Sequence, residues 1–209
     1  MVNFLLFSTH AQVCLFLKSR TSYGFHTLIR ALRCVFRAIG DRRHAAVDPV
    51  GFARSLGVSV GNNVRFYGAD RAMFGSEPWM IRIGNDCYIT AGVQFVTHDG
   101  GTLVLRKEVV DLEWSAPIVI GNDVYIGIRS IILPGVTIGN RCVIGAGAVV
   151  TRSIPDNCVV VGVPARIIKS TDEYLAQLKA KSLKCGHLKG IEKDRVLRTV
   201  YCEFLKRHW

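Results

Sequence analysis

The sequence predicts an all-β solenoid, a stack of short parallel strands with a helical extension at each end. A tetrapeptide recurs four times, as VGNN at 60, IGND at 83, IGND at 120 and IGNR at 138. Aliphatic residues also return every six positions, at Ile120, Ile126, Ile132, Ile138, Ile144 and Val150. Six residues do not close a 3.6-residue helical turn, whereas a fixed short period is typical of repeats that stack on their neighbours.

The net charge of +11 lies in the flanks of this 209-residue chain. Residues 1–46 carry seven Lys/Arg against one acid, and residues 166–209 carry eleven against five. Residues 47–165 carry nine against ten and are close to neutral. Basic flanks keep a protein solvated or bind anionic membranes and phosphorylated ligands. They do not interleave basic and aromatic residues on one face, so nucleic-acid binding is not expected.

Residues 1–46 form a basic extension in which helical spacing of apolar residues predicts one amphipathic helix, residues 26–40. Such a helix packs on the main domain or a neighbouring subunit, the favoured interpretation, or lies on a membrane surface. Asp48-Pro49 marks its break from the main domain. The apolar start of the chain is too short and too interrupted to span a bilayer, and it lacks the features of a secretion signal.

The local structure of each six-residue unit can be predicted from its residues. A short strand points its aliphatic residue inward, and the Gly and Asn that follow tolerate the tight backbone of a corner. The fourth residue after each aliphatic one must be small enough for the interior of a three-sided coil of about eighteen residues. Upstream, Ile83, Ile89 and Phe95 keep the frame. Cys87, Cys142 and Cys158 follow the same pattern and are expected to be buried, and seven cysteines without a CxxC pair favour a reducing compartment.

The stretches ILPGVTIG, IGAGAVVT and PDNCVVVGVPAR, within residues 120–169, closely resemble the hexapeptide-repeat acyltransferases. The resemblance covers about residues 47–170. It implies a left-handed parallel β-helix over residues 47–169 and a homotrimer with active sites between subunits. The stretch FGSEPWMIRIGNDCYITAGVQFVTHDGG resembles the maltose-acetyltransferase-like group, which includes polysaccharide O-acetyltransferases.

Residues 170–209 are expected to form a helical extension. Ser170-Thr-Asp-Glu173 is a capping box that opens a helix ending near Lys181. A break at Gly186 precedes a second helix, from about Lys193 to Lys206. The extension is expected to protect the open end of the solenoid or to pack on a neighbouring subunit.

His98 is the only histidine within residues 47–165. It lies three residues after Phe95, in the register of a polar corner, so it is not expected in the core. The frame then breaks for a loop of about twenty residues, 99–118, and functional residues favour loops on rigid scaffolds. The resemblance implies that His98 is the catalytic base, and histidine suits this role because its pKa lies near working pH.

Glu77 lies about one coil before His98 and is the expected orienting partner of its imidazole; the alternative is a structural corner carboxylate. Ser76, Asp99 and Trp114 are candidate substrate-binding residues. Asp99 is a weaker candidate partner for His98, because adjacent residues on a tight corner diverge. Trp114 has the aromatic surface to stack on a sugar, and it can equally pack on the solenoid.

The resemblance also implies the acetyl-coenzyme A contacts: Gly127, Ile128, Ala146, Thr151, Arg152, Arg166 and Lys169. Backbone amides at Gly127-Ile128 are the expected donors to the oxyanion that develops during transfer. Many relatives carry Ser at the position of Ile128 and Lys at that of Arg152. The cationic residues suit the phosphates of coenzyme A.

The function predicted is O-acyl transfer, most simply from acetyl-coenzyme A to a sugar or glycan hydroxyl, without a metal. N-acetylation of an amino sugar or small amine and a non-catalytic assembly scaffold remain alternatives. A zinc enzyme of the γ-carbonic anhydrase type is excluded, because its site needs three histidines and this solenoid has one. The expected location is cytoplasmic, with the basic flanks allowing peripheral association with the inner face of a membrane.

Overall fold

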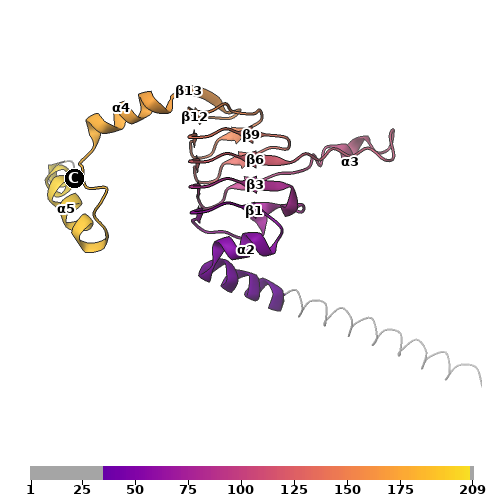
Figure 1. Ribbon diagram of the computed structural model, residues 1–209, viewed down its shortest axis with the longest axis horizontal. Helices are drawn as coiled ribbons and strands as arrows, with labels where there is room; N and C mark the ends of the chain where they lie inside the picture. Colours follow the sequence, from indigo (N-terminus) through magenta and orange to yellow (C-terminus); the bar gives the residue numbers. More distant parts are fainter. Residues whose placement is uncertain (1–34, 208–209) are drawn as a thin grey trace, which may run out of the picture.

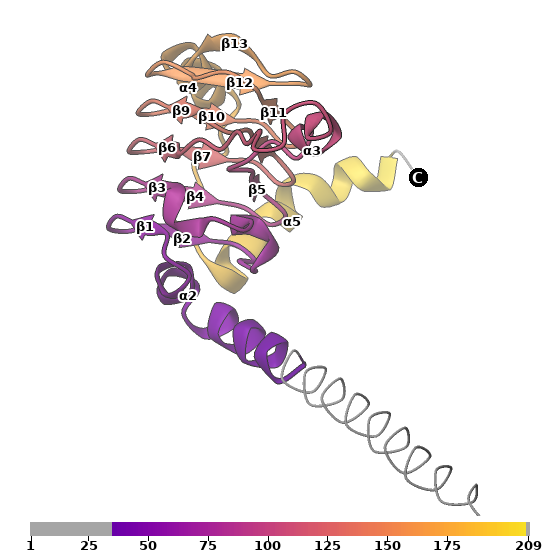
Figure 2. The same ribbon diagram turned by 90° about the vertical axis from the view of Figure 1, so that its right-hand side faces the viewer.

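The computed structural model describes residues 35–207, and its centre is a stack of coils built from three sheets (Figures 1 and 2). Sheet A contains β1 (Ser59–Val60), β3 (Ile81–Ile83), β6 (Ile118–Ile120) and β9 (Thr137–Ile138). Sheet B contains β2 (Arg65–Phe66), β4 (Tyr88–Ile89), β7 (Tyr125–Ile126), β10 (Val143–Ile144), β12 (Cys158–Val161) and β13 (Arg166–Ser170). Sheet C contains β5 (Gln94–Phe95), β8 (Ile131–Ile132) and β11 (Val149–Val150). Neighbouring strands are parallel except β12 and β13, which confirms a parallel solenoid.

The six-residue pattern corresponds to the core. Every aliphatic residue of the frame from Ile83 to Val150 is at most 2 % exposed. The small residues four positions later fill the space between strands, and Cys87, Cys142 and Ala148 among them are fully buried. The predicted frame is therefore confirmed on both sides of the loop after His98. Burial also raises the pKa of the Cys87 and Cys142 thiols, which are free.

Each residue of the repeated tetrapeptide has its own structural role. Its isoleucine is buried, and a Cβ on Gly121 would approach the Gly139 carbonyl oxygen of the next coil to 2.8 Å. The Asn122 side chain accepts a hydrogen bond from the Asn85 backbone N–H of the preceding coil at 2.8 Å. The fourth residue carries the left-handed backbone, as Asp123 does with φ 56°. The glycine is thus required by close coil packing rather than by a corner conformation.

The asparagine bonds repeat along one edge of the stack, and we call them the asparagine ladder. Its acceptors are Asn85, Asn122, Asn140 and Asp156, each of which accepts from the backbone N–H of the coil before it. The ladder satisfies a corner N–H in each coil and fixes the register between coils.

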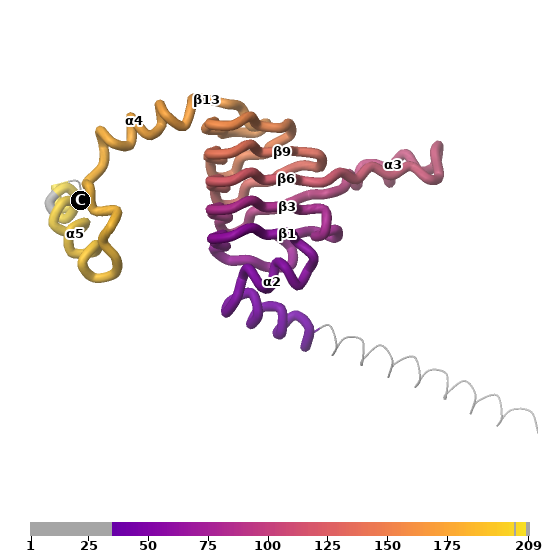
Figure 3. The backbone as a smooth tube through the Cα atoms, viewed as in Figure 1, coloured from indigo at the N-terminus to yellow at the C-terminus, as the bar shows by residue number. Residues whose placement is uncertain are grey.

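Two helices lie below the first coil (Figures 1 and 3). Residues 35–47 are helical, and α2 (Pro49–Ser55) follows after Asp48, whose side chain accepts from the Gly51 N–H. The predicted end of the first helix near Gly40 is therefore wrong, and Asp48-Pro49 is the actual break. The part of the prediction before residue 35 lies outside the described residues.

These two helices cover the end of the solenoid unequally. Phe52 and Ala53 of α2 are buried against the core, as is Ala45 at the end of the preceding helix. Phe36 and Ile39 on the earlier turns are exposed. Packing on the main domain is thus limited to the last turns of the helix 35–47. Within residues 35–207, no helix combines the length and apolarity needed to cross a membrane.

The first coil departs from the repeat on its third side. Where later coils have a strand of sheet C, the chain forms two 3-10 helices, η1 (Ala72–Phe74) and η2 (Pro78–Met80). Phe74 stacks on Phe95 of the next coil, with ring centroids 6.2 Å apart and an interplanar angle of 6°. Gly75 then turns with φ 63°. This turn brings the chain between η1 and η2 beneath the end of β5.

The interruption of the frame is a projecting loop that contains α3 (Thr102–Leu105) (Figure 3). His98 and Ser115 form an antiparallel bridge at its base, and the Ala116 N–H donates to the Thr97 carbonyl at 2.8 Å. Within the loop, Arg106 pairs with Glu113. The loop therefore leaves the stack and returns to it at the same corner.

At the other end, β13 leads into α4 (Thr171–Lys181), and α5 (Gly190–Arg207) follows. The Ser170–Glu173 capping box is present, which confirms the predicted start of the first helix, and α5 begins a few residues earlier than predicted. Both helices extend away from the last coil, and no residue of α4 is buried (Figure 1). Protection of the open end, one of the two expected roles, is therefore not what α4 and α5 do in the single chain.

Candidate active site

The structure places Glu77 directly beside His98, at the base of the projecting loop. The ring Nδ1 of His98 lies 2.8 Å from Oε2 of Glu77. The two side chains are 39 % and 29 % exposed, so the pair is accessible to a substrate. Glu77 lies between η1 and η2, so the irregular side of the first coil is what brings the carboxylate under the histidine.

The carboxylate has a second donor that the sequence analysis did not identify. The Thr97 hydroxyl donates to the same Oε2 of Glu77 at 2.7 Å. This bond, followed by the one from His98, holds the pKa of Glu77 below its usual range. An ionised carboxylate only accepts hydrogen bonds, so Nδ1 carries the proton. In the neutral ring with this tautomer, Nε2 keeps its lone pair, as a general base requires.

The three candidate substrate residues are distributed around this pair. Ser76 is next to Glu77 in sequence and is exposed. Trp114 is half exposed on the returning side of the loop, and its carbonyl accepts from the Asp99 N–H. The Asp99 side chain accepts from the Gly101 N–H at 2.8 Å, so it stabilises the turn of the loop and does not pair with His98.

Gly127, Ile128 and Ala146 lie on adjacent coils at a different corner from His98. They lie between sheets B and C, whereas His98 follows sheet C. The Gly127 N–H donates to the Ile144 carbonyl at 2.8 Å and is therefore not available to an oxyanion. The Ile128 N–H makes no hydrogen bond within residues 35–207. Of the two predicted amides, Ile128 is the candidate donor.

The remaining predicted coenzyme contacts lie toward the C-terminal end of the stack. Thr151 and Arg152 follow β11 at the corner of His98, two coils further along, and both are exposed. Arg166 and Lys169 lie on β13. The Lys169 ammonium contacts the Gln177 amide oxygen at 2.6 Å, and the exposed Arg166 guanidinium contacts its neighbour's carbonyl. One chain thus brings His98 and Glu77 together but leaves the coenzyme contacts in separate groups.

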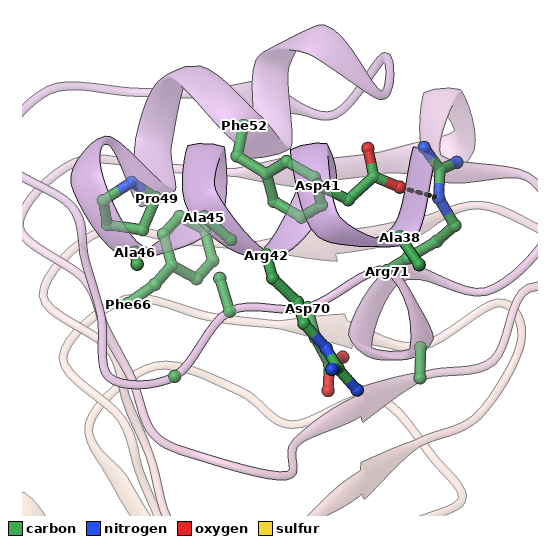
Figure 4. Close-up of a pocket in the computed structure, with 13 residues that line it drawn as sticks. Ala38, Asp41, Arg42, Ala45, Ala46, Pro49, Phe52, Phe66, Asp70 and Arg71 are labelled. Carbon is green, nitrogen blue, oxygen red and sulfur yellow. Dashed lines mark hydrogen bonds and ion pairs between the residues drawn. The ribbon is translucent and has the colours of Figure 1, made fainter. Parts of the chain in front are cut away.

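A hollow of about 530 Å³ lies elsewhere, between the helix 35–47, α2 and the first coil (Figure 4). It is lined by Ala38, Asp41, Arg42, Ala45, Ala46, Pro49, Phe52, Phe66, Gly68, Ala69, Asp70, Arg71 and Ala72. Asp41 and Arg71 pair across it at 2.9 Å. None of the predicted site residues lines this hollow, so it is separate from the candidate active site.

Comparison with known proteins gives a family match within the solenoid and relatives that extend over most of it. Residues 117–152 match the family described as bacterial transferase hexapeptide (six repeats). The chain is 56% identical to Protein CapG of Staphylococcus aureus over 133 residues, which are 64% of this chain and 76% of that protein. It is 38% identical to galactoside O-acetyltransferase of Escherichia coli strain K12 over 141 residues, 66% of each protein.

Among solved structures, the chain is similar to a hexapeptide-repeat containing acetyltransferase of Vibrio cholerae O1 biovar eltor in complex with acetyl-coenzyme A. The TM-score is 0.45 at 27% identity, over 68% of this chain and 88% of that one.

Proposed function

The chain belongs to the bacterial transferase hexapeptide family and is an acetyltransferase, and from this premise we propose that it acetylates a hydroxyl of a sugar or glycan. Acetyl-coenzyme A is the acyl donor. The observation that carries the proposal is the His98–Glu77 pair at the base of the loop. The choice of a sugar hydroxyl is supported by the similarity to galactoside O-acetyltransferase. Family membership also supports left-handed winding of the stack.

In the proposed reaction, Nε2 of His98 takes the proton of the acceptor hydroxyl as its oxygen attacks the thioester carbon. Glu77 holds the ring through Nδ1 and stabilises the imidazolium that forms. The Ile128 N–H donates to the oxyanion of the tetrahedral intermediate. The carbon–sulfur bond then breaks, and the coenzyme A thiolate takes the proton from His98. The products are an acetyl ester and coenzyme A, and no covalent enzyme intermediate is needed.

The corner that carries His98 and the corner that carries Ile128 are far apart within one chain, which supports an active site shared between two subunits. His98 follows β5, whereas Ile128 precedes β8, so they lie at opposite ends of sheet C. We therefore place the His98 corner of one subunit opposite the Ile128 corner of a neighbour, in the homotrimer that the resemblance implies. A monomeric mass for the active enzyme in solution would contradict this arrangement.

Acetyl-coenzyme A turnover across a panel of sugars, glycans, amino sugars and small amines tests the function. We expect turnover with a hydroxyl acceptor and a product whose acetyl group is released by mild alkali, as an ester is. An alkali-stable amide from the amino acceptors alone would instead support N-acetylation. Absence of both turnover and calorimetric acetyl-coenzyme A binding would support the scaffold alternative.

Replacing Arg166 by alanine is expected to raise the KM for acetyl-coenzyme A about tenfold and to leave kcat within about twofold, the effect of losing one charge-assisted bond to a phosphate. Steady-state kinetics with varied acetyl-coenzyme A measure both constants. Arg195→Ala on α5 is the matched control, because it removes the same charge from an exposed position outside the predicted contacts. A fall in kcat with unchanged KM would contradict the assignment of Arg166.

A further inference from the structure

We propose that Thr97 is a positioning residue for the reaction, whose hydroxyl fixes the Glu77 carboxylate in the orientation that binds His98. This inference rests on the proposed role of His98 as the base. It adds a third member, outside the predicted site residues, to the pair that the sequence suggested.

The burial of Thr97 limits what its hydroxyl can do. The residue is 1 % exposed, and buried hydroxyl groups in folded proteins have hydrogen-bond partners. Its partner is Oε2 of Glu77 at 2.7 Å. Phe95, two residues earlier on the same strand end, is also buried. Valine has the same shape and would fill the space, so the hydroxyl itself is the feature to explain.

One carboxylate oxygen, Oε2 of Glu77, accepts hydrogen bonds from two donors. Thr97 approaches Oε2 of Glu77 from the buried interior, and His98 approaches it from the accessible side. Adjacent residues at a strand end normally diverge, but here Glu77 comes from the coil below and reaches both. A carboxylate held by His98 alone can rotate about its last side-chain bonds, and the second donor removes that freedom.

Thr97 also connects the pair to the projecting loop. Its backbone carbonyl accepts the Ala116 N–H at 2.8 Å, at the point where the loop rejoins the stack. The side chain therefore orients the carboxylate while the main chain of the same residue fixes the loop. Placement of the base relative to loop residues such as Trp114 depends on this one position.

Thr97→Val is expected to lower kcat about tenfold, the effect of losing a hydrogen bond to a charged group, with the KM for acetyl-coenzyme A within about twofold of the wild-type value. Thr97→Ser should restore kcat to within about threefold, because it returns the hydroxyl. Thr97→Ala should lose activity as Thr97→Val does, and it provides a smaller side chain should valine impair folding. Thr171→Val is the matched control. It also removes a threonine hydroxyl, but that hydroxyl donates to the Arg141 carbonyl at 2.8 Å and not to Glu77.

Two further measurements distinguish positioning from a general structural role. In a Glu77→Ala background, Thr97→Val should change kcat by less than about twofold, because the group it acts on is gone. Nitrogen-15 spectra of the labelled His98 ring should show the proton on Nδ1 in the wild type and a mixture of tautomers in Thr97→Val.

The outcomes separate this inference from the function on which it rests. Full activity in His98→Ala would refute the proposed mechanism. If His98→Ala is inactive, the Thr97 inference is refuted by any of three results. These are wild-type kcat in both Thr97→Val and Thr97→Ala, a serine variant as impaired as the valine variant, or an undiminished Thr97→Val effect in the Glu77→Ala background.

Discussion

Replacing His98 by alanine is expected to lower kcat about a thousandfold, within the usual range for loss of a general base. The acceptor hydroxyl is a weak nucleophile until a base removes its proton, and no other histidine lies within residues 47–165. The KM for acetyl-coenzyme A should change little, because the predicted coenzyme contacts are elsewhere. Initial rates of coenzyme A release, with saturating acetyl-coenzyme A and acceptor, measure the effect.

The matched control is His187→Ala, which removes an exposed histidine from the segment between α4 and α5. It should retain wild-type kcat. Wild-type turnover in His98→Ala would exclude His98 as the base.

The second large effect is on stability. Ile144→Ala is expected to lower the free energy of unfolding by about 2 to 5 kcal/mol, as for other fully buried aliphatic side chains truncated to alanine. Ile144 is 0 % exposed on β10, which lies between β7 and β12 in sheet B. A cavity there leaves the coils above and below without a packing partner. The midpoint of urea denaturation, with the slope of the transition, measures the loss.

Val143→Ala on the same strand is the matched control, because Val143 points outward and is only partly buried. Its cost should be below about 1 kcal/mol, since most of the side chain does not contribute to the core. Equal destabilisation by the two variants would contradict the assignment of the inward and outward faces of β10.

The interior of the solenoid could be predicted residue by residue from the sequence. A period of six, with three sides to a coil, determines which residues point inward, so the pattern assigns both Ile83 and Val150 to the core although they are 67 positions apart, and both are buried. The loop after His98 did not obscure the frame, because it begins and ends at one corner. The capping box at Ser170 was equally readable, because its hydrogen bonds are local in sequence.

The surroundings of His98 could be predicted only in part. The separation between Glu77 and His98 suggests one coil, but the first coil replaces a strand by η1 and η2, and no repeat defines where the carboxylate points. Thr97 carried no usable signal, since a threonine beside a corner resembles any β-branched residue of a strand. Its importance is visible only from the shared oxygen of Glu77.

The end of the first helix is a place where the sequence pattern predicts the wrong boundary. The sequence pattern predicts that the first helix ends at Gly40, yet the helix continues to residue 47, because a single glycine weakens a helix without ending it. The side chain of Asp48 and the ring of Pro49 provide the actual boundary, through a cap and a preset backbone angle.

The asparagine ladder fixes each coil in register with the next, so positions along the solenoid are spaced in units of one coil. Each added coil moves everything beyond it by one strand spacing, about 4.8 Å, and an insertion other than a whole coil would bring polar corners into the interior. The height of Arg166 above His98 can therefore change only in whole steps, whereas the projecting loop can change length freely because it closes on Thr97 and Ala116. The distance along the stack between His98 and the predicted coenzyme contact Arg166 is thus set by the number of coils, whereas the length of the projecting loop is not.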